Sequence, residues 1–432
     1  MRVFIILLLT ASTICQAQNL DRRASWQATF SVLSPAPGVK LESIEKNSPL
    51  SKEGLQPGDI ILGVNGQSIL TSEDWSAITY GLRAGQETVI SYRRNHKVTY
   101  RNIHFDPIPR ESHETLDTHY EEIISDAGIR QRTIITIPKE RPDKLPAMIM
   151  LQGLSCSSIE VYPGRSGNWP RHINYLVENS DMVVMRVEKP GVGDSDGDCG
   201  ATDFHTELEG YRAAIRELKA KAYVDTTRII VYGSSMGSAL APLLANEFRL
   251  AAVISDGTFF KTWFEHMLEI ERRIRQMNGD SESIIVKKMN EGFIPLYYGM
   301  LIEGKTYEEV IKENPSLSDY NYHGPAHMYG RPVEYYQQLQ QMDLAGEWQK
   351  LQAPLRILYG SNDWIMSKFD NEMIMNVLDA AGHKNHELLI YPGLDHWNTI
   401  HESAANSFFG KPGRWEPKVP QQIVDWAQDF TK

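Results

Sequence analysis

The chain has 432 residues, which is more than one ordinary domain requires and enough to bury a large core. Hydrophobic residues make up 41% and charged residues 23%, the proportions of a soluble globular protein. The formal net charge is -11 at pH 7, and basic residues form no cluster in the sequence, so a nucleic-acid-binding protein is not expected.

The first segment has a basic start, a short apolar run and a small-residue end, as a secretory signal peptide does. The apolar run is too short to span a bilayer as a helix. We expect cleavage after Ala17, so that residues 1–17 are removed and the protein reaches the periplasm; acylation of Cys15 is the alternative. Two cysteines, Cys156 and Cys199, then remain in an oxidising compartment, as one disulfide or as two buried thiols.

Residues 28–105 are dense in turn residues and short strand-like stretches. Residues 38–44 alternate as a half-buried strand does, and Gly-Asp and Asn-Gly turn signals flank a short Ile/Val run at 60–64. A helix is predicted from residue 72 to about residue 82, followed by a hairpin over 88–103. The sequence therefore predicts a small β-rich domain.

This segment resembles a PDZ domain of the bacterial type. The residues that carry the resemblance are Ser48-Pro49, Gly54-Leu55, Pro57-Gly58-Asp59-Ile60-Ile61 and Val64-Asn65-Gly66. The resemblance implies that an extended peptide could bind as an added strand, with its C-terminal carboxylate held by backbone N–H groups. Use of the domain as an internal spacer or gate is the alternative.

A polar, Pro-bearing linker is expected at residues 106–117, followed by a second domain at 118–432. Two amphipathic strands at 120–124 and 131–137 begin it. Apolar runs without polar alternation then predict strands buried on both faces, at 147–151, 182–187, 229–232, 251–254, 355–359 and 387–391. Helical stretches alternate with them, at 170–179, 206–222, 238–248, 370–381 and 420–430. This alternation predicts a mostly parallel α/β sheet. Residues 258–349 interrupt it with a helical, Met- and aromatic-rich segment, which we expect to form a cap over the substrate pocket.

The strongest local motif is Gly233-Ser234-Ser235-Met236-Gly237, which fits G-x-S-x-G. A short buried strand precedes it and an apolar helix follows it, and this context predicts a nucleophile elbow. The turn is expected to hold Ser235 in a strained conformation near the positive end of a helix, with its hydroxyl exposed at the end of the sheet.

A serine hydroxyl is a poor nucleophile at neutral pH, so it needs a base and a carboxylate to orient that base. Asp363 and His396 each follow the end of a predicted strand, in the chain order Ser, acid, His. We therefore assign Ser235 as nucleophile, His396 as general base and then acid, and Asp363 as its orienter. Asp256, which follows an earlier strand, is the alternative acid, and Asp395 is expected to have a surface or turn role.

The oxyanion formed on attack needs two donors. One is expected to be the backbone N–H of Met236, next to the nucleophile. The other should come from the loop after residue 151, where the N–H of Leu154 is our choice and that of Ser155 the alternative.

The region from about residue 118 to the end thus resembles an α/β-hydrolase. The elbow and the triad order carry the resemblance, together with residues 186–197, which are similar to the family's Arg-x-Asp-x-x-Gly-x-Gly-x-Ser-x-Gly loop. The resemblance implies acyl transfer to water through a covalent acyl-Ser235, with Asp194 and Ser195 as structural braces. Cys156 and Cys199 lie in or beside loops that leave adjacent strand ends, so a disulfide between them is expected.

The sequence therefore predicts a secreted serine hydrolase, most simply a carboxylesterase acting on a small-molecule ester. A serine peptidase with peptide recruitment by the PDZ-like domain is one alternative, and a non-enzymatic PDZ adaptor with an inactive hydrolase-like body is the other. His-Glu-x-x-His, clustered Cys/His, a Walker loop and a G-x-G-x-x-G after a strand are all missing from the sequence, so no metal or cofactor is expected. Neither nucleic acid nor a transmembrane segment is expected.

Overall fold

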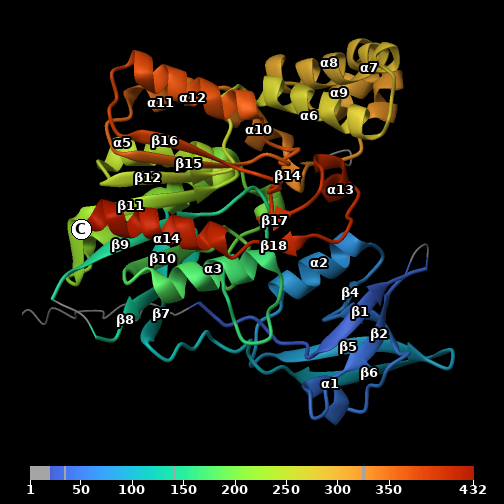
Figure 1. Cartoon of the computed structure of the whole chain (residues 1–432). Helices are drawn as coiled ribbons and strands as arrows, with labels where there is room; N and C mark the ends of the chain where they lie inside the picture. Colours follow the sequence, from blue (N-terminus) through green and yellow to red (C-terminus); the bar gives the residue numbers. More distant parts are fainter. Residues whose placement is uncertain (1–19, 34–35, 141–142, 324–326) are drawn as a thin grey trace, which may run out of the picture.

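The computed structural model describes residues 20–33, 36–140, 143–323 and 327–432, and the predicted signal peptide lies outside these ranges. Two sheets, one small and one large, organise the chain (Figure 1). No helix within these ranges has both the length and the apolar character needed to cross a membrane.

The smaller sheet is antiparallel and has the strand order β1-β2-β3-β5-β6, with β4 paired to β3. Its strands are β1 (Ala28–Val32), β2 (Val39–Ile44), β3 (Ile60–Val64), β4 (Gln67–Ser68), β5 (Glu87–Arg94) and β6 (Lys97–His104). Two helices complete the domain, α1 (Pro49–Lys52) and α2 (Ser72–Gly81). Thr71 and Asp74 form a capping box at the start of α2, which satisfies backbone N–H groups that the helix itself leaves free.

The larger sheet has eight strands in the order β16-β15-β12-β11-β9-β10-β8-β7. They are β7 (Leu116–Ile124), β8 (Arg130–Pro138), β9 (Leu145–Leu151), β10 (Val183–Val187), β11 (Val224–Ser234), β12 (Ala252–Asp256), β15 (Leu355–Gly360) and β16 (His386–Tyr391). The pairs β7–β8 and β8–β10 are antiparallel, and the other neighbours are parallel. This mixed sheet with helices confirms the predicted fold class, and β7 begins inside the stretch expected to be a linker.

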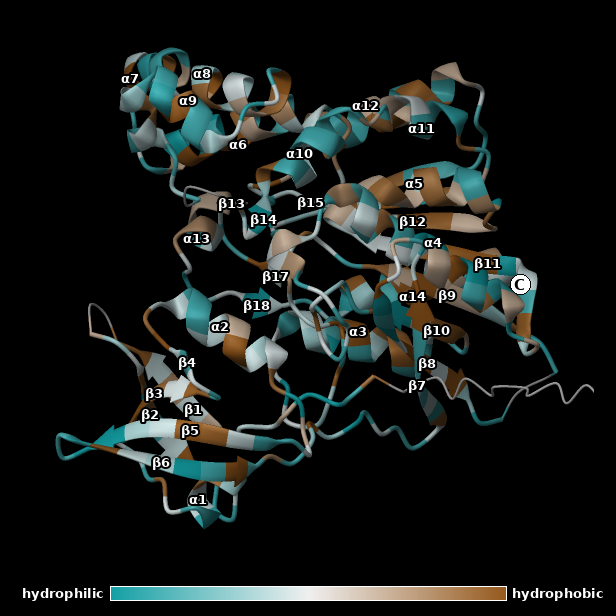
Figure 2. Cartoon of the chain, turned by 180° about the vertical axis from the view of Figure 1, so that it is seen from behind, coloured by the Kyte–Doolittle hydropathy of each residue, from teal (hydrophilic) through white to brown (hydrophobic). Residues whose placement is uncertain are grey.

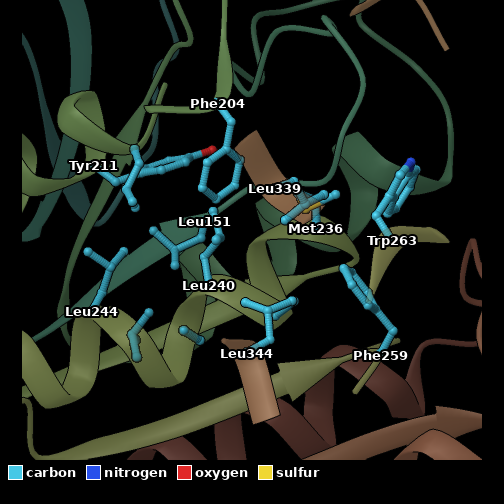
Figure 3. Packing of buried hydrophobic residues seen from close by; sticks show 14 of the residues in the cluster. Leu151, Phe204, Tyr211, Met236, Leu240, Leu244, Phe259, Trp263, Leu339 and Leu344 are labelled. Atoms are coloured by element: carbon cyan, nitrogen blue, oxygen red, sulfur yellow. The ribbon is translucent and has the colours of Figure 1, made fainter. Parts of the chain in front are cut away.

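Helices cover both faces of the larger sheet. One face carries α3 (Asn168–Asn179) and α14 (Lys418–Thr431); the other carries α4 (Phe204–Ala220), α5 (Met236–Phe248) and α12 (Lys368–Ala380). Successive strand residues point to opposite faces. Accordingly, Met148 and Ile230 pack on the α3 side, while Ile149 and Val231 pack on the α5 side. Figure 2 shows hydrophobic residues concentrated on these central strands, and Figure 3 shows part of the α5-side cluster.

The segment between β12 and β15 forms the insertion that the sequence predicted to be helical. It contains α6 (Trp263–Met277), α7 (Glu282–Lys288), η2 (Met289–Phe293), α8 (Ile294–Tyr297), η3 (Tyr298–Ile302), α9 (Tyr307–Glu313), η4 (Pro315–Tyr320), α10 (Val333–Gln340) and α11 (Leu344–Lys350). A two-stranded ladder, β13 (His327–Met328) with β14 (Arg331–Pro332), was not predicted, because strands of two residues leave no alternating pattern. Helices α6 to α9 project together as one lobe (Figure 1).

The small domain contacts the large one through charged side chains. The guanidinium of Arg22, just before β1, donates to Glu160 at 2.8 Å and to Asp194 at 3.0 Å. Arg83 donates to the Ser195 carbonyl at 3.3 Å. Asp194 and Ser195 belong to the loop after β10, so the loop expected to brace the site also holds the small domain.

Candidate active site

Ser235 lies alone between β11 and α5, with φ 55° and ψ −121°. A positive φ is unfavourable for a residue with a side chain and costs roughly 1–3 kcal/mol. The Ser235 N–H donates to the Asp256 carbonyl of β12 at 2.8 Å, which helps to hold the turn. The serine side chain lines a cavity at the end of the larger sheet.

The two glycines of the motif allow the strand and the helix to approach each other. A Cβ on Gly233 would lie 2.3 Å from the Gly237 carbonyl oxygen, and one on Gly237 would lie 2.2 Å from the Leu151 carbonyl oxygen. Both distances are shorter than any van der Waals contact, and the obstacles are backbone atoms. The spacing of the motif therefore follows from this packing.

The three residues assigned from the sequence as a triad lie together. The Nε2 atom of His396 is 3.0 Å from Ser235 Oγ, and its Nδ1 atom is 2.7 Å from Asp363 Oδ2. Asp363 Oδ1 accepts from the N–H groups of Ile365 and Met366, each at 2.8 Å. Each oxygen of the carboxylate is thus bonded, and one of them faces the imidazole.

The environment shifts the pKa values of Asp363 and His396 in opposite directions. Burial acts to raise the pKa of the Asp363 carboxyl, but the facing His396 and the two N–H donors lower it below its ordinary value overall. Burial acts to lower the pKa of His396, but Asp363 raises it above its ordinary value, with a smaller contribution from Asp256. A carboxylate held ionised beside an imidazole favours the imidazolium that forms during proton transfer.

Asp256, the alternative acid, belongs to a different hydrogen-bond network. Its Oδ2 accepts from the Tyr232 hydroxyl at 3.3 Å and from the Asn398 amide at 3.4 Å. Burial raises the pKa of this carboxyl to about 6. The hydrogen bond of His396 Nδ1 goes to Asp363, so the geometry favours Asp363 as the orienting acid.

Asp395, the neighbour of His396, accepts from the N–H groups of Trp397 and Thr399 at 2.9 Å each and from the Ser407 hydroxyl at 2.7 Å. These bonds fix the loop that carries His396. They are the bonds of a turn residue, and Asp395 is buried, so the surface role that the sequence also allowed is wrong.

The loop after β9 approaches Ser235 closely. A Cβ on Gly153 would lie 3.1 Å from Ser235 Cβ. The Gly153 carbonyl oxygen accepts from Lys189 Nζ at 2.5 Å. Leu154 and Met236, chosen as oxyanion donors, both line the cavity beside Ser235. Met236 is the first residue of α5, where helix N–H groups have no partner within the helix.

A disulfide joins Cys156 of this loop to Cys199, with a sequence separation of 43. The guanidinium of Arg331, from the inserted segment, donates to the Cys199 carbonyl and also pairs with Glu207 of α4. Glu207 is in turn 3.1 Å from Lys189. Buried polar contacts therefore connect the inserted segment to the loop beside Ser235.

A second basic residue of the insertion bonds the loop that carries Asp363. Arg273 of α6 donates to the carbonyls of Ile365 and Met366, at 2.6 and 2.8 Å. The N–H groups of the same two residues hold Asp363. Neither Arg273 nor Lys189 was predicted as a site residue, since nothing in their local sequence identifies the distant carbonyls that they contact.

The cavity has a volume of about 700 Å³. Its wall is rich in aromatic side chains, namely Trp169, Phe259, Trp263, Tyr329, Trp364 and Trp397. Apart from His396, the described residues that line it carry no charge at neutral pH, because burial lowers the pKa of His266 to about 3. In the described part of the chain, no group of three or more His, Cys, Asp and Glu side chains is arranged to hold a metal ion.

Known proteins resemble the two parts of the chain separately. Esterase EstD of Thermotoga maritima is 20% identical over 293 residues, which are 68% of this chain, and the chain spans 64% of that esterase. A probable periplasmic serine endoprotease, DegP-like, of Pseudomonas putida is 34% identical over 96 residues, or 22% of this chain and 19% of the endoprotease. Among solved structures, the Pyrococcus furiosus esterase Pf2001 is 14% identical with a TM-score of 0.44, covering 75% of this chain and 97% of its own.

Family profiles match both domains. The profile described as PDZ domain matches residues 18–104. The profile described as serine aminopeptidase, S33, matches residues 165–403, which is more than half of the chain and includes Ser235, Asp363 and His396. The chain therefore belongs to the serine aminopeptidase S33 family of α/β-hydrolases and carries a PDZ domain before the hydrolase domain.

Proposed function

We propose that this protein is a serine carboxylesterase that transfers the acyl group of an ester to water through Ser235. The observation that carries the proposal is the placement of His396 between Ser235 Oγ and Asp363 Oδ2, at 3.0 and 2.7 Å. A base within hydrogen-bond distance of the nucleophile and of an orienting acid is the arrangement that activates a serine.

In the first half of the reaction, His396 Nε2 takes the proton from Ser235 Oγ as this oxygen attacks the ester carbonyl carbon. The N–H groups of Met236 and Leu154 then donate to the oxyanion; one such donor contributes roughly 10²- to 10³-fold to kcat in serine hydrolases. His396 next gives its proton to the leaving alcohol, and the acyl group stays on Ser235.

In the second half, a water molecule takes the place of the alcohol. His396 accepts a proton from this water as its oxygen attacks the acyl carbonyl, and returns it to Ser235 Oγ as the acid leaves. The ionised Asp363 favours the imidazolium in both halves.

The lining of the cavity favours neutral acyl groups over peptides with a free amino terminus. An ammonium group bound among Phe259, Trp263 and Ile270 would lose its hydration without gaining a carboxylate partner from the described wall. An apolar or aromatic acyl group gains stabilisation from the same surface. Esters whose acyl group carries no charge are therefore the substrates that the site fits best.

A panel of substrates tests the proposal on the full-length protein. We expect p-nitrophenyl esters to be hydrolysed and aminoacyl and peptidyl anilides to be turned over far more slowly. A fluorophosphonate probe should label the wild type, and Ser235→Ala should lose both labelling and hydrolysis. Anilide turnover exceeding that of the esters would support a peptidase instead, and an unlabelled wild type would support a non-enzymatic protein.

We further propose that the PDZ domain is an internal spacer. Trp75 of α2 packs against Phe30 of β1 and against Trp26, with ring centroids 4.8 and 4.9 Å apart. Side chains of α2 and of the edge strand β1 are thus in direct contact on the side where a peptide would add as a strand. A C-terminal peptide library selected on the Ser235→Ala protein should yield no common motif; an enriched motif would contradict the proposal.

Export to the periplasm is proposed on the signal-like residues 1–17 and on the Cys156–Cys199 disulfide, since disulfides persist in oxidising compartments. The mature protein should begin at Gln18 and be released by osmotic shock. A full-length N-terminus in the cytoplasmic fraction would contradict export, and a lipid-modified Cys15 would identify a lipoprotein.

A further inference from the structure

A tryptophan directly follows each of the two residues proposed as acid and base. Trp364 comes after Asp363, and Trp397 comes after His396. Both side chains line the cavity. Their ring centroids are 5.8 Å apart and the ring planes are inclined by 49°. The two loops that carry the acid and the base thus also supply one paired aromatic wall.

This wall adjoins the histidine on which the leaving group depends. The ring of Trp397 is 5.4 Å from that of His396, at an interplanar angle of 87°. In the proposed reaction, His396 Nε2 protonates the leaving oxygen, so that oxygen must lie within hydrogen-bond distance of Nε2. The group attached to it therefore begins beside His396, within reach of the paired tryptophans.

One tryptophan of the pair is packed against the protein, and the other is partly exposed to solvent. Phe408 of α13 (Ala404–Phe408) packs edge-on against Trp364 with centroids 5.2 Å apart. Trp397, in contrast, is 47% exposed. A large aromatic ring left open to solvent at a cavity is a surface that a ligand can cover.

We propose that Trp364 and Trp397 form the leaving-group subsite and that this subsite selects esters of aromatic alcohols. The inference rests on the proposed esterase function. An aromatic ring can stack or pack edge-on with the two indoles, which adds to the burial that any ring of that size gains. A saturated ring gains the burial alone.

The test compares two esters with the same acyl group, benzyl acetate and cyclohexylmethyl acetate. Both release a primary alcohol that carries a six-membered ring. We expect kcat/KM of the full-length protein to favour the benzyl ester by roughly 3- to 10-fold, the range of one aromatic pair. Trp397→Leu should bring the ratio down to that of the uncatalysed alkaline hydrolysis of the two esters, while Trp397→Phe should keep a larger preference for the benzyl ester.

Phe409→Leu is the matched control. Phe409 is 54% exposed and its ring is 5.0 Å from that of Phe408, but it is not among the residues that line the cavity. The ratio of the two esters should stay at the wild-type value in this variant. Thermal unfolding of each variant checks its fold.

A second measurement on the wild type needs no substitution. Benzyl alcohol should inhibit p-nitrophenyl acetate hydrolysis more strongly than cyclohexylmethanol does. Equal inhibition, equal turnover of the two esters, or a preference that Trp397→Leu leaves at the wild-type value would overturn the subsite while Ser235-dependent hydrolysis still supports the esterase. A wild-type protein that neither hydrolyses any of the esters nor reacts with the fluorophosphonate probe would instead overturn the esterase function itself.

Discussion

Lys189 Nζ lies 2.5 Å from the carbonyl oxygen of Gly153. The peptide unit that contains this carbonyl also contains the N–H of Leu154, and in a planar trans peptide the two groups point in opposite directions. By holding the carbonyl on one side, Lys189 directs the Leu154 N–H to the other. Its side chain is 1% exposed, and Glu207 at 3.1 Å is its ion-pair partner.

Lys189→Met should therefore lower kcat more than it raises KM. We expect a fall of about 10- to 100-fold, less than the loss of a whole oxyanion donor, because the loop would keep its place but not its direction. The affinity for a boronic acid, which mimics the tetrahedral intermediate, should fall by a similar factor. Lys350→Met is the control, since Lys350 is 63% exposed and paired only with Glu347. An unchanged kcat in Lys189→Met would refute the orienting role.

Substitution of Asp363 and of Asp256 in turn tests which of the two carboxylates orients His396. Asp363→Asn should lower kcat by about 10⁴-fold, because an amide in place of the carboxylate favours the wrong imidazole tautomer. Asp256→Asn should cost far less, since Asp256 bonds Tyr232 and Asn398. Steady-state kinetics on a p-nitrophenyl ester measures both. The reverse order of effects would make Asp256 the orienting acid.

The pH profile should report the raised pKa of His396. Because the neutral imidazole is the base, kcat/KM falls as the pH drops through this pKa, which lies above the ordinary 6.5. Removal of the Asp363 charge takes away the main contribution that raises this pKa, so the acid limb of the residual activity should move to lower pH in Asp363→Asn. Asp256→Asn should move it in the same direction by less. A limb that stays in place in Asp363→Asn would show that another group titrates.

The site was predictable wherever its signals are local in sequence. The strand, turn and helix around Ser235 carry their own composition, and Asp363 and His396 follow strands that read clearly as buried runs. Chain order then suggested the proposed roles. The eight-stranded sheet was predictable for the same reason, because its central strands lack polar alternation.

Contacts with the insertion could not be predicted in this way. Arg273 and Arg331 reach the site only because of how the helices of the insertion fold, and their partners lie 92 and 132 residues away. Trp364 and Trp397 were visible beside the triad, but a loop sequence does not fix where a side chain points. The rings could be recognised as one wall only from their coordinates.

The disulfide should stabilise the hydrolase domain. Cross-linking over a separation of 43 residues removes unfolded-chain entropy worth about 4 kcal/mol. The double variant Cys156→Ala, Cys199→Ala should lose about this much free energy of unfolding in urea, followed by tryptophan fluorescence. Reduction with dithiothreitol should lower the stability of the wild type similarly and leave the variant unchanged. Equal stability of the two proteins under oxidising conditions would contradict this prediction.

A buried ion pair joins the segment before β7 to the larger sheet, and its removal should destabilise the protein. Both carboxylate oxygens of Glu111 accept from Arg186 at 2.7 Å, and neither side chain is exposed. Glu111→Gln would leave the guanidinium buried without a counter-charge, so we expect a loss of about 3–5 kcal/mol in the free energy of unfolding. Glu42→Gln is the control, because the Lys40–Glu42 pair is exposed and screened by solvent, so its loss should change the stability little.

The contribution of Glu111 to the stability should depend on pH. Burial acts to raise the pKa of the Glu111 carboxyl, but Arg186 prevails and lowers it from 4.5 to about 2. A carboxyl with a lowered pKa contributes stability that is fully present above its unfolded value and is lost as the pH falls through its folded value. Glu111 also raises the pKa of His113, 3.5 Å away, above its ordinary 6.5, so the stability difference between wild type and Glu111→Gln should rise as the pH falls from 7 and His113 becomes protonated. It should then shrink below about pH 4.5 as Glu111 itself becomes protonated. A difference that is unchanged at pH 3 would mean that the loss comes from packing and not from the charge.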